Sequence, residues 1–315
     1  MDKIKIQFED FWHSNDLEEI VDNPIYKILS KRYELVLSDN PDFLVYSCFG
    51  NNYLKYNCIR IFYTGENVRP NFDECDYAFS FDYPVTKRNY RLPLYKLYPE
   101  FDDIRGGGVD TEAVLSENRK FCNFVYSNDK AKERIDFFTK LNNRKHVDSG
   151  GRVLNNIGRC VENKVDFLRQ YKFTIAFENT SYPGYTTEKI MQPFVANSIP
   201  IYWGDPLVSQ DFNSKAFINC HDYGSFDEVI DRVIEIDGND ELYKEYLSEP
   251  VFPENIESKC VNEDNIVNKF QEIFSNKKID FVAKKTDVLK YYTEGVREKV
   301  LSIVPYRVSN IFRKK

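Results

Sequence analysis

The sequence predicts an α/β protein built from two Rossmann-like domains, and two observations lead to this prediction. Short, nearly continuous apolar runs alternate with helical or loop segments through both halves of the 315-residue chain. Such runs are typical of strands that are buried on both faces of a sheet. In addition, the apolar runs Phe173–Phe177 and Ile199–Trp203 flank a segment with helical character. This order predicts a βαβ unit whose two strands are parallel in one sheet.

The first domain is expected to span residues 1–118. Its predicted strands are Ile4–Phe8, Glu34–Leu37, Phe43–Ser47, Ile59–Tyr63 and Tyr77–Phe81. A single helix is expected over Leu17–Lys31, where apolar residues recur with helical spacing. The segment Leu97–Arg119 is rich in charges and contains Pro99 and three consecutive glycines. We therefore expect it to form a loop and linker.

The second domain is expected to span residues 119–285. Besides the two strands of the βαβ unit, it should contain strands over Phe121–Ser127 and Ala216–Ile218. Its predicted helices are Lys130–Leu141, Lys164–Tyr171, Glu188–Asn197 and Phe226–Ile236. Pro193 lies inside the third helix, where it removes a backbone donor. A short or kinked helix is expected there.

Composition narrows the range of functions. The net charge of −7 argues against nucleic acid as the main partner. No apolar run approaches the roughly 18 residues that a membrane span needs, and the N-terminus has no apolar core of a signal peptide. Seven scattered cysteines without a Cys-x-x-Cys pair favour buried, reduced thiols and a cytoplasmic location. The chain contains no Asp-x-Asp motif, and its three histidines lack metal-pair spacing, so no metal site is predicted.

The C-terminal segment 286–315 is predicted to be a basic helical tail. Residues 290–315 contain seven basic and two acidic residues, a net charge of +5. Their apolar residues fall roughly on one helical face, which Pro305 interrupts. One interpretation is a peripheral segment at an anionic membrane surface. The alternative is a helix that packs over the domain junction with a solvated basic end.

Polar residues of the βαβ unit indicate where a ligand binds. Asn179, Tyr185, Glu188 and Lys189 are expected at the carboxyl end of a parallel strand, where ligands collect in such sheets. Lys189 in the first helical turn is electrostatically unfavourable, because a helix N-terminus carries partial positive charge. An anion such as a diphosphate would resolve that conflict. The segment therefore predicts a nucleotide-sugar site.

Glu66 is the candidate general base. It follows the strand Ile59–Tyr63 and Gly65, so it is expected in a loop at the carboxyl end of that strand, facing a cleft between the domains. A carboxylate that is partly shielded from water has a raised pKa, which suits it for accepting a proton near neutrality. The alternative is an ordinary surface glutamate near a turn.

Six ordered motifs resemble the α1,3/4-fucosyltransferases of glycosyltransferase family 10, and the bacterial members in particular. The resemblance extends from about residue 33 to about residue 275. In this chain, the segment FENTSYPGYTTEKI (177–190) followed by IPIYWGDP (199–206) resembles the donor-binding signature of that family. The other blocks are FYTGENVRPNF (62–72), CDYAFSFDY (75–83), RLPLY (91–95), the segment 124–134 and FINCHDY (217–223).

The resemblance implies a fold and roles for individual residues. The fold would be GT-B, with two Rossmann-like domains that face a cleft, the acceptor in the first and the donor in the second. Glu66 would be the catalytic base, and Arg134 and Lys189 would be the cations that stabilise the departing nucleotide. Asn179, Tyr185 and Glu188 would line the donor pocket. Alternatively, Arg134 is a solvated helical arginine, Glu188 favours the helix N-terminus and Asn179 shapes a turn.

These expectations define a function. The protein is expected to be an inverting, metal-independent fucosyltransferase that needs no cofactor and moves fucose from GDP-fucose to an oligosaccharide acceptor. The acceptor is expected to be the 3-hydroxyl of GlcNAc in Galβ1,4GlcNAc, which gives a Lewis x type product, as in modification of a lipopolysaccharide O-antigen. The alternatives are a GT-B transferase with another nucleotide sugar or acceptor, and a catalytically silent glycan- or nucleotide-binding protein.

Overall fold

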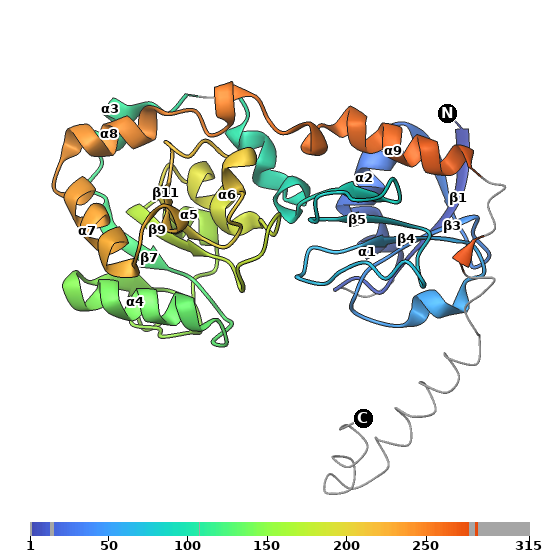
Figure 1. Cartoon of the computed structure of the whole chain (residues 1–315), viewed down its shortest axis with the longest axis horizontal. Helices are drawn as coiled ribbons and strands as arrows, with labels where there is room; N and C mark the ends of the chain where they lie inside the picture. Colours follow the sequence, from blue (N-terminus) through green and yellow to red (C-terminus); the bar gives the residue numbers. More distant parts are fainter. Residues whose placement is uncertain (1, 13–15, 107, 277–280, 283–315) are drawn as a thin grey trace, which may run out of the picture. The chain divides into compact units, whose positions relative to one another are not determined.

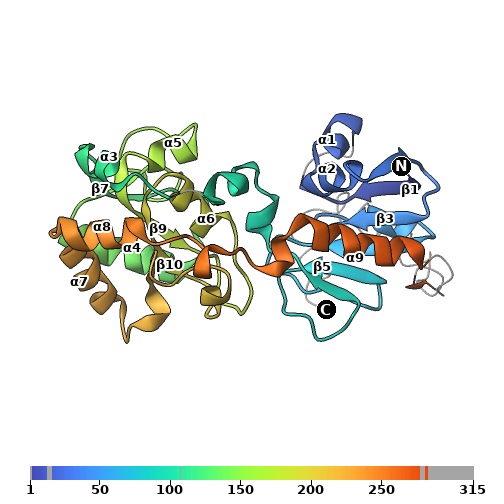
Figure 2. The ribbon, with the colours of Figure 1, turned by 90° about the horizontal axis from the view of Figure 1, so that it is seen from above.

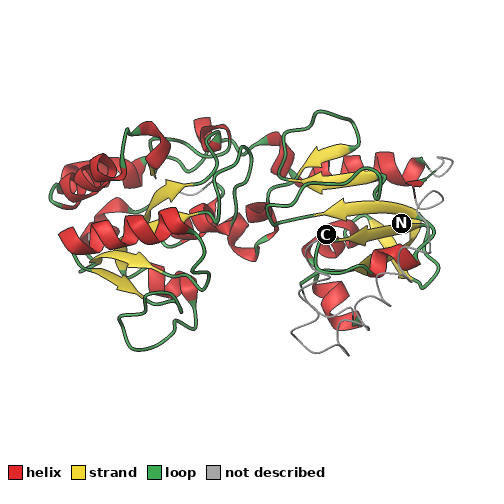
Figure 3. Ribbon diagram, turned by 60° about the horizontal axis from the view of Figure 1, so that its bottom comes forward, coloured by secondary structure: helices red, strands yellow, loops and turns green. Residues whose placement is uncertain are grey.

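The computed structural model describes residues 2–12, 16–106, 108–276 and 281–282. The chain divides into two compact units (Figure 1). Of the described residues, unit 1 comprises those within 2–80, 85–90 and 267–282, and unit 2 comprises those within 81–84 and 91–266. Each unit contains its own sheet with helices on its faces, as Figure 3 shows. The predicted α/β architecture with parallel sheets is confirmed.

Unit 1 contains a six-stranded sheet with the order β2-β1-β3-β4-β5-β6. Its strands are β1 (Asp2–Glu9), β2 (Tyr33–Leu37), β3 (Phe43–Tyr46), β4 (Ile59–Tyr63), β5 (Tyr77–Ser80) and β6 (Asn89–Arg91). The β1–β2, β1–β3, β3–β4 and β4–β5 pairs are parallel. The loops that follow β1, β3 and β4 therefore lie at one edge of the sheet.

Aromatic packing covers both faces of this sheet. On one face lie α1 (Leu17–Asp22), α2 (Pro24–Ser30) and α9 (Glu263–Ser275). Phe270 of α9 stacks on Phe79 at a centroid distance of 4.2 Å, and Phe274 lies 4.7 Å from Phe43. The other face is covered by the short helix η1 (Asn52–Lys55), where Tyr53 stacks on Tyr46. Figure 2 shows α9 lying across this unit.

The predicted helix over Leu17–Lys31 is two helices in the structure. Asp16 caps α1 by accepting a hydrogen bond from the backbone of Glu19. Pro24 cannot donate to an uninterrupted helical ladder, but it is favourable at the first position of a new helix. Accordingly, α2 begins at Pro24 with Asn23 as its N-cap. The helical spacing of the apolar residues was right, and the break lies at the proline.

Unit 2 contains a five-stranded, wholly parallel sheet with the order β11-β10-β9-β7-β8. Its strands are β7 (Lys120–Phe124), β8 (Val147–Ser149), β9 (Tyr171–Phe177), β10 (Ile199–Trp203) and β11 (Ile218–Asn219). Ile201 of β10 aligns with Ile175 of β9, so the predicted βαβ unit is present. The strand β8 was not predicted, because its three residues give too short an apolar pattern.

Two layers of helices cover the sheet of unit 2 (Figures 1 and 2). One layer comprises α3 (Thr111–Ser116), α4 (Lys132–Arg144), α7 (Phe226–Asp237) and α8 (Asp240–Ser248). The other comprises α5 (Lys164–Leu168), α6 (Glu188–Val195) and the short helices η2 (Leu94–Leu97) and η3 (Pro99–Ile104). Pro193 lies inside α6, which ends at Val195, two residues before the predicted end.

The division into units differs from the predicted domain limits. Residues 91–118 were placed in the first domain, but Tyr95, Phe101 and Ile104 are buried in the core of unit 2. Conversely, α9 was placed in the second domain, but its rings pack on the sheet of unit 1. The segment predicted as a loop contains η3 and α3. Its buried apolar residues are too widely spaced to give a periodic pattern in sequence.

The predicted basic tail, residues 286–315, lies outside the described residues, and its interaction with membranes stays a prediction. Among the residues that the structure describes, no helix is long and apolar enough to cross a membrane.

Candidate functional site

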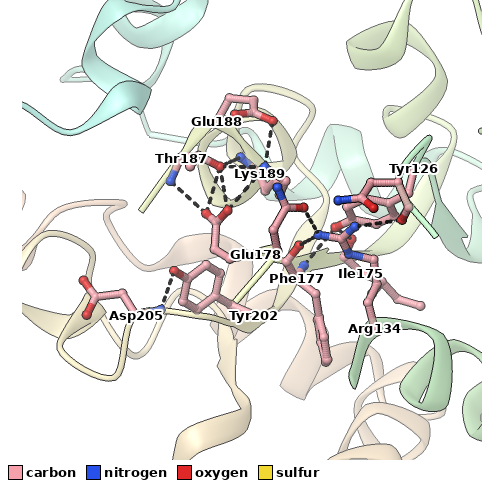
Figure 4. A network of polar contacts seen from close by, with 12 residues as sticks. Tyr126, Arg134, Ile175, Phe177, Glu178, Thr187, Glu188, Lys189, Tyr202 and Asp205 are labelled. Carbon is pink, nitrogen blue, oxygen red and sulfur yellow. Dashed lines mark hydrogen bonds and ion pairs between the residues drawn. The ribbon is translucent and has the colours of Figure 1, made fainter. Parts of the chain in front are cut away.

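A buried carboxylate organises the junction between β9 and α6. Glu178 directly follows β9 and is fully buried. Its Oε1 accepts hydrogen bonds from the backbone N–H of Thr187 at 2.8 Å and from the Thr187 hydroxyl at 2.9 Å. Thr187 is the N-cap of α6. Glu178 therefore fixes the start of α6 against the end of β9, as Figure 4 shows.

Lys189 lies between two carboxylates in the first turn of α6. Its Nζ is 3.3 Å from Glu178 Oε2 and 3.2 Å from Glu188 Oε1, and it donates to the Thr187 hydroxyl at 3.0 Å (Figure 4). The Lys189 side chain keeps 13% of its surface exposed, and that of Glu188 keeps 15%. The electrostatic conflict that the sequence indicated is thus partly relieved by two carboxylates of the chain itself.

The charges of this cluster shift the pKa values of its two carboxylates in opposite directions. Burial raises the pKa of Glu178, although the nearby Lys189 ammonium opposes that rise. Burial would also raise the pKa of Glu188, but the charges of Lys189 and Lys164 outweigh it and lower that pKa to about 2. The two carboxylates in turn outweigh the effect of burial on Lys189 and raise its pKa well above the ordinary value. Lys189 therefore stays charged, and Glu188 is the carboxylate that stays ionised most readily.

The Trp-Gly-Asp motif begins with the last residue of β10, and its Gly204 and Asp205 make room for this cluster and support it. A Cβ atom on Gly204 would lie 2.4 Å from Cγ of Glu178, so only glycine fits beside the buried glutamate. Asp205 accepts a hydrogen bond from the Thr186 hydroxyl at 3.0 Å, while its backbone N–H donates to the Tyr202 hydroxyl at 2.9 Å. The motif thus holds the residues that precede α6.

Arg134 is fully buried, so it is not a solvated helical arginine. Its Nη2 donates to the carbonyl of Phe177 and to Oδ1 of Asn179, each at 2.8 Å. The guanidinium lies 3.8 Å from the ring centroid of Tyr126, whose hydroxyl accepts from Phe177 N–H at 2.8 Å (Figure 4). Arg134 therefore connects α4 to the end of β9 and fixes the position of Asn179.

Tyr185 and its loop are anchored within unit 2. Tyr185 is 2% exposed and packs edge to face on Phe81 with a centroid distance of 5.1 Å. Gly184 has a φ of +86°, and a Cβ atom there would lie 2.4 Å from the carbonyl oxygen of Phe81. The close approach and the left-handed conformation together require glycine. Tyr185 is thus near Lys189, but its side chain is mostly covered in this conformation.

A buried ion pair also supports the loop that contains Gly184 and Tyr185. Arg91 and Asp211 form two hydrogen bonds of 2.8 and 2.6 Å, and their side chains are 5% and 1% exposed. Arg91 also donates to the carbonyl of Gly184 at 3.5 Å and lies over the ring of Tyr83. Removing one partner of such a pair leaves a buried charge without compensation. The arginine of the RLPLY block is therefore needed as the partner of buried Asp211.

Glu66 lies in unit 1, at the carboxyl edge of the sheet after β4. Its backbone N–H donates to the Thr64 hydroxyl at 3.0 Å, and the same hydroxyl donates to the Glu66 carbonyl. The residue is exposed, so its carboxylate is not shielded from water in this structure. Glu66 lies beyond the end of the buried strand, on a tight turn that the Thr64 hydroxyl holds.

Three residues of the Lys189 cluster were not singled out from the sequence. Glu178 belongs to the motif FENTSYPGYTTEKI, but the neighbouring residues in the sequence do not reveal that it is buried. Lys164 begins α5, and its charge acts on Glu188. Tyr98 precedes η3, and its pKa is raised by burial and then by the negative charge of Glu188. Tyr98 and Lys164 reach the cluster only through tertiary packing, so no local signal announced them.

All seven cysteines are free, and Cys58, Cys75, Cys122 and Cys220 are buried. The described part of the chain contains no group of three or more His, Cys, Asp or Glu side chains that would hold a metal ion.

Two family models match the chain. A model described as the Alpha-(1,3)-fucosyltransferase FucT N-terminal domain matches residues 6–98, and the Glycosyltransferase family 10 (fucosyltransferase) C-terminal model matches residues 115–249. A crystal structure of an α1,3-fucosyltransferase with GDP-fucose has 31% sequence identity and a TM-score of 0.75, covering 89% of this chain and 93% of that one. The chain belongs to glycosyltransferase family 10.

Other members of the family agree in sequence and fold. A crystal structure of an α1,3-fucosyltransferase without a named ligand has 32% identity and a TM-score of 0.79, covering 91% of this chain and 93% of that one. The Alpha-(1,3)-fucosyltransferase FucT of Helicobacter pylori is 36% identical over 285 residues, 78% of this chain. This chain spans 60% of that relative's length. The GT-B fold expected from the resemblance is therefore confirmed.

A more distant relative is the human 4-galactosyl-N-acetylglucosaminide 3-alpha-L-fucosyltransferase 9. It is 26% identical over 139 residues, which cover 43% of this chain and 38% of the human protein.

Proposed function

We propose that this family 10 protein is an inverting α1,3-fucosyltransferase that uses GDP-fucose as its donor. The observation that supports this function most directly is the Lys189 ammonium at the carboxyl edge of the unit 2 sheet, held by Glu178, Glu188 and Thr187. A cation fixed at the N-terminus of α6 suits an anionic diphosphate. The similar crystal structures with GDP and with GDP-fucose support the identity of the donor.

In this proposal the donor binds to unit 2. Lys189 contacts the diphosphate. Lys164, whose charge acts on Glu188, adds a second cation, although burial lowers the pKa of Lys164. Ionised Glu188 accepts hydrogen bonds from hydroxyls of the ribose or the fucose. Asn179 and Tyr185 complete the donor pocket. Because Arg134 is buried, it acts through its charge and through the orientation of Asn179.

Glu66 of unit 1 is the general base in this proposal. It takes the proton from an acceptor hydroxyl, whose oxygen forms a bond to the anomeric carbon of fucose. The bond from that carbon to the diphosphate breaks on the opposite face, and GDP leaves with the electron pair, so the anomeric configuration inverts. The Lys189 charge stabilises the departing diphosphate. Bound substrates would supply the shielding that exposed Glu66 lacks in this structure.

The proposed acceptor hydroxyl is the 3-OH of GlcNAc in a Galβ1,4GlcNAc unit, and the product is of Lewis x type. The printed name of the human relative, which describes a 4-galactosyl-N-acetylglucosaminide acceptor, supports this choice. Acceptor choice depends on loops of unit 1, which a shared fold does not determine. Modification of a lipopolysaccharide O-antigen is the corresponding proposed role.

The decisive experiment measures GDP release from GDP-fucose with a panel of disaccharide acceptors. Transfer to Galβ1,4GlcNAc, with an α1,3 linkage identified in the product, is the expected result. Turnover with another nucleotide sugar or another acceptor instead would favour a different GT-B transferase. Binding of GDP-fucose with no turnover on any acceptor would favour a silent binding protein.

A further inference from the structure

Two aromatic side chains are exposed at the same sheet edge as Glu66. Trp12 keeps 43% of its surface exposed and Phe49 keeps 47%. Trp12 follows β1 and Phe49 follows β3, while Glu66 follows β4. These three strands are parallel neighbours in the order β1-β3-β4. The two rings and the proposed base therefore share the carboxyl edge of unit 1.

The two rings are held in a fixed mutual arrangement. Their centroids lie 6.0 Å apart at an interplanar angle of 85°, an edge-to-face pair. The backbone connects their loops, because Phe49 N–H donates to the carbonyl of Asp10 at 3.0 Å. Asp10 is buried, and its carboxylate accepts from the backbone N–H groups of Asn52 and Tyr53. The ring pair therefore lies on a backbone that is held by hydrogen bonds to Asp10.

A chain of contacts connects the ring pair to the Glu66 turn. Trp12 packs edge to face on Phe11 at 5.9 Å, and Phe11 stacks on Tyr63, the last residue of β4, at 6.3 Å. On the other side, Sγ of Cys48, the neighbour of Phe49, lies 3.8 Å from the Thr64 hydroxyl that holds the Glu66 turn. A pair of exposed rings held beside the proposed base offers an apolar surface that a ligand could cover.

We propose that Trp12 and Phe49 form the acceptor platform, on which a pyranose ring next to the fucosylated sugar stacks through its apolar C–H face. This inference rests on the proposed function and names the residues that bind its acceptor. A β-galactose unit fits this chemistry, because its ring presents C–H groups on one face and hydroxyls at its rim. Two perpendicular rings suit a single sugar, whereas a protein partner would need a larger apolar surface.

The first test compares steady-state kinetics of single variants with Galβ1,4GlcNAc as the acceptor. Trp12→Ala and Phe49→Ala should each raise the acceptor KM roughly 10-fold, as expected for the loss of one ring contact. The KM for GDP-fucose and the slow hydrolysis of GDP-fucose by water should not change. Trp12→Phe should retain most of the affinity, because it keeps an aromatic face. Val85→Ala is the control, since Val85 is a 99% exposed apolar residue of unit 1.

The second test observes Trp12 directly and does not depend on turnover. The chain contains two tryptophans, Trp12 and Trp203. In a Trp203→Phe background, the remaining fluorescence should change on titration with Galβ1,4GlcNAc but not with GDP. This readout remains decisive even where an alanine variant fails to fold. If the wild-type protein transferred no fucose, the proposed function would fail, whereas the fluorescence titration would still decide the platform.

Two outcomes would overturn the platform. One is an acceptor KM that stays unchanged in both alanine variants while the wild-type enzyme transfers fucose. The other is a Trp12 fluorescence that does not respond to acceptor concentrations that saturate the wild-type enzyme.

Discussion

Glu178 and Glu66 both follow a strand at the carboxyl edge of a parallel sheet, yet their surroundings are opposite. Glu178 is fully buried and bound to Thr187 and Lys189. Glu66 is exposed on a turn that its own backbone and Thr64 hold. The buried carboxylate maintains the geometry of a site, while the exposed one is available to react. In the proposed mechanism, unit 2 would therefore be organised before the donor binds, whereas the substrates would complete the environment of the proposed base.

Of the changes that test this comparison, Glu66→Gln should have the largest effect, and that effect is on turnover. We expect turnover to fall roughly 10²–10⁴-fold, because the amide cannot accept the acceptor proton. GDP affinity and thermal stability should stay near wild type, since the side chain is exposed and lies in the other unit. Steady-state kinetics and calorimetric titration of GDP measure the two effects. Asp73→Asn, at another exposed acid of unit 1, serves as the matched control.

Unchanged turnover in Glu66→Gln would remove Glu66 from the mechanism. Loss of GDP binding in the same variant would instead assign it a role in the donor site.

The second effect should be on stability, through Glu178→Ala. This change leaves the Lys189 ammonium without one buried partner and Thr187 without its acceptor. Breaking a buried ion pair by removing one partner costs about 3–5 kcal/mol. Urea unfolding should show a loss of this size, with no comparable loss in Glu133→Ala, a control at an exposed glutamate on α4. A Glu178→Ala protein as stable as the wild type would mean that the buried carboxylate is not structural.

These two glutamates also show what the sequence can and cannot predict. The strand β4 was predicted to the residue, since four of its five residues are apolar or aromatic and the polar residue Thr64 follows them. The position of Glu66 at the end of β4 followed from that strand. Its exposure did not follow, because it depends on a turn conformation and on tertiary cover.

The proposed donor site shows the same limit at a larger scale. The sequence indicated that Lys189 opposes the helix dipole, and the structure places it in an ion-pair cluster at the N-terminus of α6. The burial of Arg134 was not foreseen, because polar neighbours surround it in sequence while the β9 end and the ring of Tyr126 enclose it in space. Lys164 reaches the cluster from a different helix. Local patterns predict elements and their ends, but not which distant side chains meet there.

A third and smaller effect should appear in Lys189→Met. The methionine keeps an unbranched side chain of similar length but removes the charge that the diphosphate would contact. We expect the Kd of GDP to rise roughly 10–100-fold, as for the loss of a charge-assisted hydrogen bond. Calorimetric titration of GDP measures this, with Lys132→Met as a control at an exposed lysine of α4. Unchanged GDP affinity would show that the ion-pair cluster does not contact the diphosphate of the donor.

The smallest expected effect is that of a chelator, and it tests whether the cationic side chains of unit 2 are sufficient for catalysis. Lys189 and Lys164 both act on Glu188 through their charges, so in the proposed site they would supply the positive charge that a departing diphosphate requires. We therefore expect EDTA to change turnover by less than about two-fold, because electrostatic stabilisation by fixed charges needs no exchangeable ion. The measurement is GDP release with EDTA, with added magnesium and with added manganese.

Modest stimulation by a cation is compatible with this expectation, since a cation also screens the free diphosphate. Complete loss of activity in EDTA that manganese or magnesium alone restores would contradict it. The leaving group would then depend on a bound metal ion, and the Lys189 cluster would be a structural feature of the α6 N-terminus.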